Sequence, residues 1–145
     1  MIDAIREGWS WKGIEPEAVV RTNAFGHVLF RDPIGRVWRI IPEDLNCTLA
    51  AESEAALSKL FMNPEFCRDW EMQALVDLAA SKFGSQTDER CYCLKTPAVL
   101  GGSYQLENLG TISRRELISA SGSIAQQVEG LPDGERITLR VRHDV

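Results

Sequence analysis

The sequence predicts an α+β fold, with an antiparallel or mixed β-sheet of about five strands and helices packed against it. Three observations predict it: strand-like segments joined by a tight turn, capped helical segments among them, and no regular strand–helix–strand alternation of the Rossmann kind. The length of 145 residues fits one domain. We expect residues 1–145 to form it, with residues 1–14 as an N-terminal docking segment.

The first part of the chain is expected to form two short helices. Trp9 and Trp11 would dock the first of them. Glu15-Pro16-Glu17 is typical of a helix start, because Pro is tolerated in the first turn and acidic groups suit its positive end. We therefore predict a second short helix that starts at residues 15–17 and continues through residues 18–22. The helices of the chain are expected to pack on one side of the sheet.

A β-hairpin follows these helices. Residues 27–31 and 36–41 are rich in β-branched and aromatic residues. Asp32-Pro33-Ile34-Gly35 between them places Pro and Gly as a type I turn prefers. Pro42 ends the second strand, and residues 47–50 are expected to add a third.

Two more helices are predicted from their caps. Ser53 is an N-cap for a short amphipathic helix, and Asn63-Pro64 marks the start of a longer one. The apolar spacing continues that longer helix to about Phe83, and Gly84 ends it.

The C-terminal third begins with a predicted strand over residues 90–95. Residues 106–110 are expected to be a loop. Ser113 and Glu116 have capping-box spacing and start a helix that could be interrupted near Ser121-Gly122.

The end of the chain is predicted to be a turn followed by a strand. Residues 131–134 read Leu-Pro-Asp-Gly, a strong turn signal. Residues 137–142 alternate cleanly between apolar and polar and would form a last strand at a sheet edge. Because such an edge can pair with a second copy, a homodimer stays open.

The composition is that of an ordinary globular protein, with 44% hydrophobic and 26% charged residues. No apolar run approaches the length that spans a bilayer, and the N-terminus lacks the pattern of a signal peptide. We therefore expect a cytoplasmic protein that does not engage membranes.

Sequence motifs for metal binding or catalysis are absent. The four cysteines contain no CxxC pair, and His27 and His143 do not cluster with them. Gly101-Gly102 lacks the pattern of a phosphate-binding loop. We predict no catalytic residue, no metal and no cofactor. Two alternatives remain: a ligand-binding or scaffold module using Gly101-Gly102 and Tyr104, and, less favoured, a small hydrolase with an acidic site.

The charge distribution is more informative than the total of -5. Between Ile41 and Ala80 eight acidic residues face two basic ones, so this stretch is more negative than the whole chain. An acidic surface disfavours direct nucleic-acid binding and suits a basic partner. The alternative is a pair of solvated helix faces that only aid solubility.

Four motifs in a fixed order resemble a known bacterial family. They are Trp38-Arg39-Ile40-x-Pro42-Glu43, Lys95-x-Pro97, Gly101-Gly102-x-Tyr104 and Leu131-Pro132-Asp133-Gly134. Together they are similar to the C-terminal domain family of type VI secretion immunity proteins, named for a protein that protects against a DNase effector. The resemblance spans roughly residues 15–140. The Trp-rich N-terminal part weakly resembles the GAD-related domain that often precedes this family.

The resemblance implies a cytoplasmic, non-catalytic inhibitor that binds a cognate toxin, often a nuclease, and covers its active site. The toxin contacts would then be exposed carboxylates. Our candidates are Glu43, Asp44, Glu52, Glu54, Glu65, Asp69 and Glu71. The motif residues themselves are assigned to maintenance of the fold; they are Trp38, Pro42, Lys95, Pro97, Gly101, Gly102, Tyr104 and Asn108.

Overall fold

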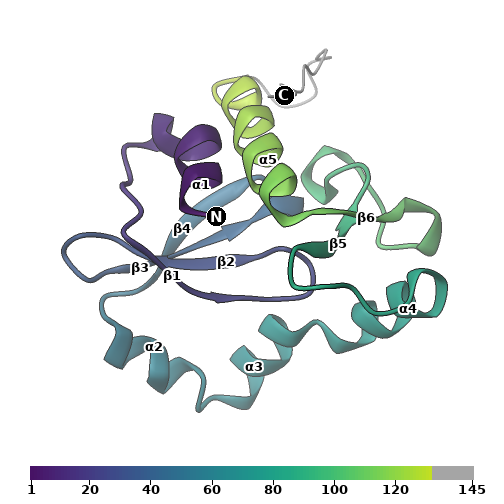
Figure 1. The fold of residues 1–145 in the computed structure, drawn as a ribbon, viewed down its shortest axis with the longest axis horizontal. Helices are drawn as coiled ribbons and strands as arrows, with labels where there is room; N and C mark the ends of the chain where they lie inside the picture. Colours follow the sequence, from purple (N-terminus) through teal and green to yellow (C-terminus); the bar gives the residue numbers. More distant parts are fainter. Residues whose placement is uncertain (132–145) are drawn as a thin grey trace.

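The computed structural model of the chain describes residues 1–131 and contains two antiparallel sheets (Figure 1). The larger has the strand order β1-β2-β3-β4, and the smaller pairs β5 with β6. The strands are β1 (Ala18–Thr22), β2 (Val28–Arg31), β3 (Val37–Ile41), β4 (Asn46–Ala51), β5 (Arg90–Leu94) and β6 (Leu109–Ser113). The helices are α1 (Ile2–Trp9), α2 (Glu54–Leu60), α3 (Pro64–Glu71), α4 (Gln73–Phe83) and α5 (Arg114–Val128). Short 3-10 turns include η1 (Ser10–Lys12), η2 (Pro42–Asp44), η3 (Ala98–Leu100) and η4 (Leu106–Asn108).

The predicted α+β class is confirmed, and the placement of the helices is corrected. Helices α1 and α5 lie on one face of the larger sheet, and α2 and α3 lie on the other (Figure 1). Strand β2 explains the difference: Val28 and Phe30 face the α1–α5 side, whereas Leu29 faces the α2–α3 side. All three are 0–1% exposed. A strand buried on both faces needs helices above and below it.

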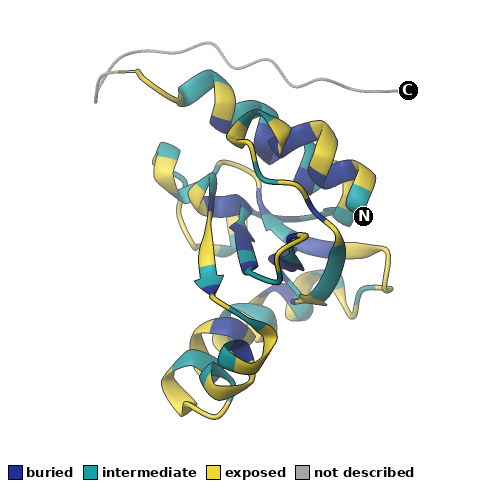
Figure 2. Ribbon diagram, turned by 90° about the vertical axis from the view of Figure 1, so that its left-hand side faces the viewer, coloured by how far each residue is buried: buried dark blue, intermediate teal, exposed yellow. Residues whose placement is uncertain are grey.

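The α1–α5 side holds the largest aromatic core. Trp9 of α1 packs with Ile118 of α5 and with Phe30 of β2. Each of these side chains is at most 2% exposed. Burial of one such side chain stabilises the fold by about 1.5–3 kcal/mol. The helices on both faces combine buried and exposed residues, as expected of amphipathic elements (Figure 2).

A close crossing joins α1 to α5. The Trp9 indole donates to the backbone oxygen of Ile118 at 3.0 Å. The Trp11 indole donates to the backbone oxygens of Gly8 and Gly122, at 2.8 and 3.1 Å. At this crossing a Cβ on Gly122 would overlap the Gly8 carbonyl, and a Cβ on Gly8 would meet the backbone of Ile118 and Ser119, so neither position has room for a side chain. The two tryptophans that we expected to dock the N-terminal helix therefore bond directly to α5.

The smaller sheet has its own core with α4. Phe25 packs against Tyr92 of β5, with ring centroids 5.6 Å apart, and Ala79 of α4 joins the cluster. Tyr92 N also donates to Ala24 O at 2.9 Å, which ties β5 to the loop before β2. The prediction of one sheet of about five strands is therefore corrected: the chain forms two sheets, and the loop before β2 joins them through its hydrogen bond to β5.

Residues 18–22 form strand β1, so the predicted second helix is wrong. Val19 and Val20 are β-branched and favour extended backbone. Glu17 N donates to Arg31 O at 2.8 Å, which starts the pairing with β2 immediately after Pro16. The Pro and the acidic pair therefore precede an edge strand, where Pro is also tolerated.

The helix predicted from Pro64 to Phe83 is in fact two helices. Met72 adopts a left-handed conformation with φ of 50°, which ends α3 and turns the chain into α4. A residue other than glycine loses free energy in the left-handed conformation, so contacts with the rest of the protein must stabilise Met72 in it. Asn23 Nδ2 bonds both Trp70 O at 2.9 Å and Met72 Sδ at 3.7 Å.

Other boundaries follow their predicted signals. Ser53 and Ser113 accept from the backbone N of Ala56 and Glu116, and α5 runs without interruption past Ser121-Gly122. Strand β6 begins inside the segment predicted to be a loop. The turn from residue 132 onward and the strand at residues 137–142 lie outside the described residues.

Asp32 holds the β2–β3 turn together. Its Oδ1 accepts from the backbone N of Ile34 and Arg36, and its Oδ2 accepts from Arg36 Nε and Trp38 Nε1, all at 2.9–3.0 Å. Burial alone would raise the pKa of Asp32, but the hydrogen bonds from Trp38 and Arg36 outweigh it and hold the pKa at about 2. The usual value is 3.8.

Replacement of Asp32 by Asn is expected to destabilise the fold by about 2 kcal/mol, since an amide nitrogen would face two donors. Because the folded-state pKa lies below the ordinary one, the charge stabilises the protein above pH 4 and that contribution is lost as the pH falls towards 2. Urea unfolding of both proteins at pH 7 and at pH 2 measures this. If wild type and variant lose the same free energy of unfolding between pH 7 and pH 2, the Asp32 charge does not stabilise the fold.

Candidate functional site

Five exposed carboxylates lie on one helical layer of the molecule. Helix α2 buries Leu57 and helix α3 buries Trp70 against the sheet, so the opposite sides of both helices face solvent. The acidic helix surface consists of Glu52, just before α2, with Glu54, Glu65, Asp69 and Glu71. Lys59 and Arg68 are the basic residues on the same two helices. The layer therefore presents a net negative charge to solvent.

Two of these carboxylates are held by arginines from the sheet. Glu54 pairs with Arg31 at 3.2 Å, and Asp69 pairs with Arg39 at 2.8 Å. Arg31 also pairs with Glu17, and the two acids raise its pKa above the ordinary value. The remaining three side chains of the acidic helix surface have no ion pair among the described residues. They are Glu52, Glu65 and Glu71.

Glu43 does not have the exposed position that we expected of a toxin contact. It is 7% exposed and lies in η2, where Pro42 starts a turn at the end of β3. Its neighbour Asp44 is exposed, as expected. Partial desolvation by neighbouring atoms first, and then the charge of Glu43, raise the pKa of Asp44 above the ordinary value, against smaller opposing contributions from His27 and Arg39. Of the seven candidate carboxylates, only Glu43 is buried.

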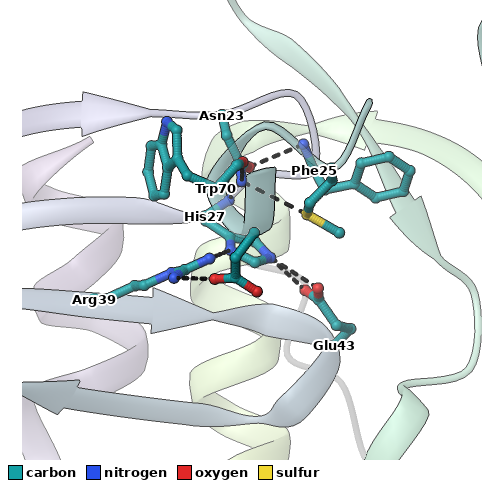
Figure 3. Close-up of polar contacts among 8 residues, drawn as sticks. Asn23, Phe25, His27, Arg39, Glu43 and Trp70 are labelled. Atoms are coloured by element: carbon teal, nitrogen blue, oxygen red, sulfur yellow. Dashed lines mark hydrogen bonds and ion pairs between the residues drawn. The ribbon is translucent and has the colours of Figure 1, made fainter. Parts of the chain in front are cut away.

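Glu43 is engaged by a buried histidine (Figure 3). Arg39 Nη2 lies 2.9 Å from His27 Nδ1, and because a guanidinium can only donate, Nδ1 must accept. The imidazole proton is therefore on Nε2, which lies 2.8 Å from both carboxylate oxygens of Glu43. The geometry defines a neutral histidine between a cation and a carboxylate.

The network continues from the histidine to the acidic helix surface. Arg39 binds His27 with one terminal nitrogen and Asp69 with the other. Its guanidinium also lies 5.2 Å from the ring centroid of Trp70. Asp69 has a 68% exposed side chain, so one chain of contacts runs from the solvent at α3 to the interior at η2.

Asn23 fixes the backbone around the histidine. Its Oδ1 accepts from the backbone N of Phe25 and His27, each at 3.0 Å (Figure 3). Sequence reasoning missed Asn23 and Arg39 as structural centres. The one signal for Arg39 was its place between the apolar residues Trp38 and Ile40. An arginine that points into the protein needs buried hydrogen-bond acceptors, so such a position indicates a polar network.

The groups of this network bond to one another inside the protein. His27 is 3% exposed, and both of its ring nitrogens are already occupied. Within residues 1–131, no three His, Cys, Asp or Glu side chains are grouped so that they could hold a metal ion. His143 lies outside the described residues. The four cysteines are free, and burial raises the pKa of Cys47 and Cys91 to about 12.

The motif residues after β5 shape a rigid loop. Asn108 accepts from Thr96 N at 3.0 Å and donates to Thr96 O and Ser103 O at 3.0 and 2.7 Å. A Cβ on Gly102 would overlap the Thr96 carbonyl, so no other residue fits there. Gly101 has a φ of 92°, which also favours glycine.

The other motif residues have different surroundings. Trp38 Nε1 donates to Asp32, Pro42 is buried in η2, and Pro97 O accepts from the backbone N of Leu100 and Gly102. Lys95 is exposed. Tyr104 is 47% exposed, which is more than a residue needed only for the fold requires.

A mainly apolar cavity of about 210 Å³ lies between η2, β5 and α5. Its wall includes Leu45, Leu94, Leu117 and Ile124, and the carboxylate residue Glu43. This cavity had no signal in the sequence, because its lining comes from four stretches of the chain that are far apart in sequence. None of the helices in the described part of the chain has the length and apolarity needed to cross a bilayer.

Similarity to known proteins was found at two levels. A family model described as T6SS immunity protein Tdi1, C-terminal, matches residues 51–125. No curated protein matches the chain. The crystal structure of Atu4351 from Agrobacterium tumefaciens is similar in fold, with a TM-score of 0.55 and 13% sequence identity. The match covers 83% of this chain but 61% of that one, so this chain spans less than two thirds of its structural relative.

Proposed function

The chain belongs to the family of T6SS immunity protein Tdi1, C-terminal, which indicates an effector-neutralising role, and we propose that its target is a nuclease effector whose active site it covers. The family that the sequence motifs predicted is thereby confirmed over residues 51–125. The GAD-related likeness of the N-terminal part stays a prediction.

The observation that carries the proposal is the acidic helix surface. A nuclease must attract a phosphate backbone, so the entrance to its active site is basic. Five exposed carboxylates on one helical layer offer the complementary charge, and three of them have no ion pair within residues 1–131. Charge complementarity of this kind accelerates association and disfavours wrong partners.

We infer that neutralisation proceeds by binding alone. The buried His27 has no free ring nitrogen, and the carboxylates of the acidic helix surface lie open to water. General acid–base catalysis needs a group whose proton can reach a substrate, and the enclosed imidazole does not provide one. An inhibitor of a nuclease would act where the nucleic acid is, so we place the protein in the cytoplasm.

Co-expression with the effector encoded beside it tests the proposal. Cells that make the effector alone should stop growing, and cells that also make this chain should recover. The purified pair should form a 1:1 complex in size-exclusion chromatography and lack nuclease activity. Absence of a complex with the neighbouring effector, or growth rescue without binding, would contradict the proposal.

A further inference from the structure

The cavity between η2, β5 and α5 combines an apolar wall with one buried carboxylate. Leucine and isoleucine account for five of the thirteen lining residues, and Glu43 is the acidic residue among them. Its volume of about 210 Å³ corresponds to about seven water molecules, which is ample for one long side chain. A cavity that results only from imperfect packing of apolar side chains has no reason to include an acidic residue in its wall.

The Glu43 carboxylate retains capacity for a further donor. Its two oxygens offer about four acceptor positions. In the described structure a single N–H, that of His27 Nε2, serves both oxygens at 2.8 Å. Both oxygens therefore have a partner, and the 93% buried carboxylate still has free acceptor positions. A second donor, particularly a cationic one, would be strongly favoured at this position.

The region beside the cavity is electronegative. The pKa of Asp44 is raised by burial and then by the Glu43 charge, against smaller opposing contributions from His27 and Arg39, and the pKa of Tyr104 is raised by burial and then by Glu43 and Asp44. Both shifts report the same local field. An incoming cation would relieve this repulsion, whereas an anion would add to it.

We propose that this cavity receives a lysine or arginine side chain of the cognate effector, with its aliphatic stem against the apolar wall and its charged end at Glu43. The inference rests on the proposed function, since it needs an effector that binds this chain. Lysine and arginine have the required chemistry, because both carry a charge at the end of a hydrocarbon stem.

The chain's own lysine does not fill this role. Lys95 contributes to the cavity wall but is exposed. Its Cγ and Cε lie 3.5 Å from the position that a Cβ on Gly110 would take, so its stem runs along β6. No hydrogen bond or ion pair joins Lys95 to Glu43 in the described structure. The buried carboxylate therefore stays available to an outside cation.

A cavity-filling variant tests the proposal on the complex. Ala120 lines the cavity from α5, and Ala120→Leu places a branched side chain there without loss of helix propensity. We expect the dissociation constant of the effector complex to rise roughly 100-fold, as for loss of a buried charge pair. Gln126→Leu, an exposed site on the same helix that does not line the cavity, is the matched control and should change it less than threefold. Thermal melting checks that both variants fold.

The outcomes separate the two proposals. If wild type and Ala120→Leu bind the effector equally well, the cavity inference is wrong and the immunity function stands. If wild type does not bind the effector at all, the proposed function fails first. A second arm titrates the free chain with n-butylammonium and with n-pentanol, and follows the Glu43 and Ala120 signals by NMR. Tighter binding of butylammonium supports a cation site, and equal or tighter binding of pentanol overturns it.

Discussion

A Gly122→Ala variant is expected to lose about 3 kcal/mol or more of folding stability. A Cβ at this position would overlap the backbone carbonyl of Gly8 and lie 2.7 Å from its Cα. Backbone atoms cannot rotate away as a side chain can, so α1 would have to separate from α5. That separation also lengthens the hydrogen bonds from Trp9 to Ile118 and from Trp11 to Gly122. Since a domain is stable by only about 5–15 kcal/mol, the loss is large.

Urea unfolding followed by tryptophan fluorescence measures the effect, because Trp9 and Trp11, two of the four tryptophans, lie at this crossing. Ser123→Ala is the control, since it changes a neighbouring residue of α5 and removes only a hydroxyl that has no hydrogen bond to any residue in 1–131. It should retain wild-type stability within about 0.5 kcal/mol. A Gly122→Ala protein as stable as the control would mean that the helices are not in backbone contact.

The elements that were predicted correctly carry local signals. Ser53, Asn63 and Ser113 each accept from a backbone N of the helix that they start, so the cap and the helix belong to the same few residues. The β2–β3 hairpin is similar, because Asp32 and Gly35 close the turn through bonds within it. Such features need no knowledge of distant parts of the chain.

The elements that were missed depend on distant partners. Strand β1 exists because Glu17 and its successors pair with β2, and β6 exists because residues 109–113 pair with β5. The break at Met72 is supported by Asn23, which is far away in sequence. Local propensity gives way to such contacts when the tertiary partner supplies more hydrogen bonds and burial than the local alternative.

The candidate site shows the same division. Six of the seven acidic candidates are exposed, as expected of charged residues. Glu43 differs because His27, which lies just before β2 and is itself bonded to Arg39, meets it only in the folded protein. A sequence can indicate where charges accumulate, but which of them turn inward depends on partners that three-dimensional pairing brings together.

Charge reversal on the acidic helix surface is expected to slow association with the effector by roughly 10- to 1,000-fold at low salt. The variant replaces Glu52, Glu65 and Glu71 by Lys. Each change adds two positive charges, so the formal charge goes from -5 to +1. These three side chains have no ion pair within residues 1–131, so their replacement breaks no internal bridge. Stopped-flow association rates at several salt concentrations measure the effect.

The control separates the location of the charge from its total amount. Asp3 and Glu7 are exposed on α1 and Glu129 is exposed just after α5, across the sheet from α2 and α3, and none of the three lines the cavity. Their replacement by Lys gives the same total charge on the other face. If the acidic helix surface binds the effector, the control should associate several times faster than the test variant at low salt, and high salt should narrow the gap, because screening weakens steering. Equal rates for the two triple variants would show that net charge alone matters and would remove this surface from the interface, while the immunity role would remain.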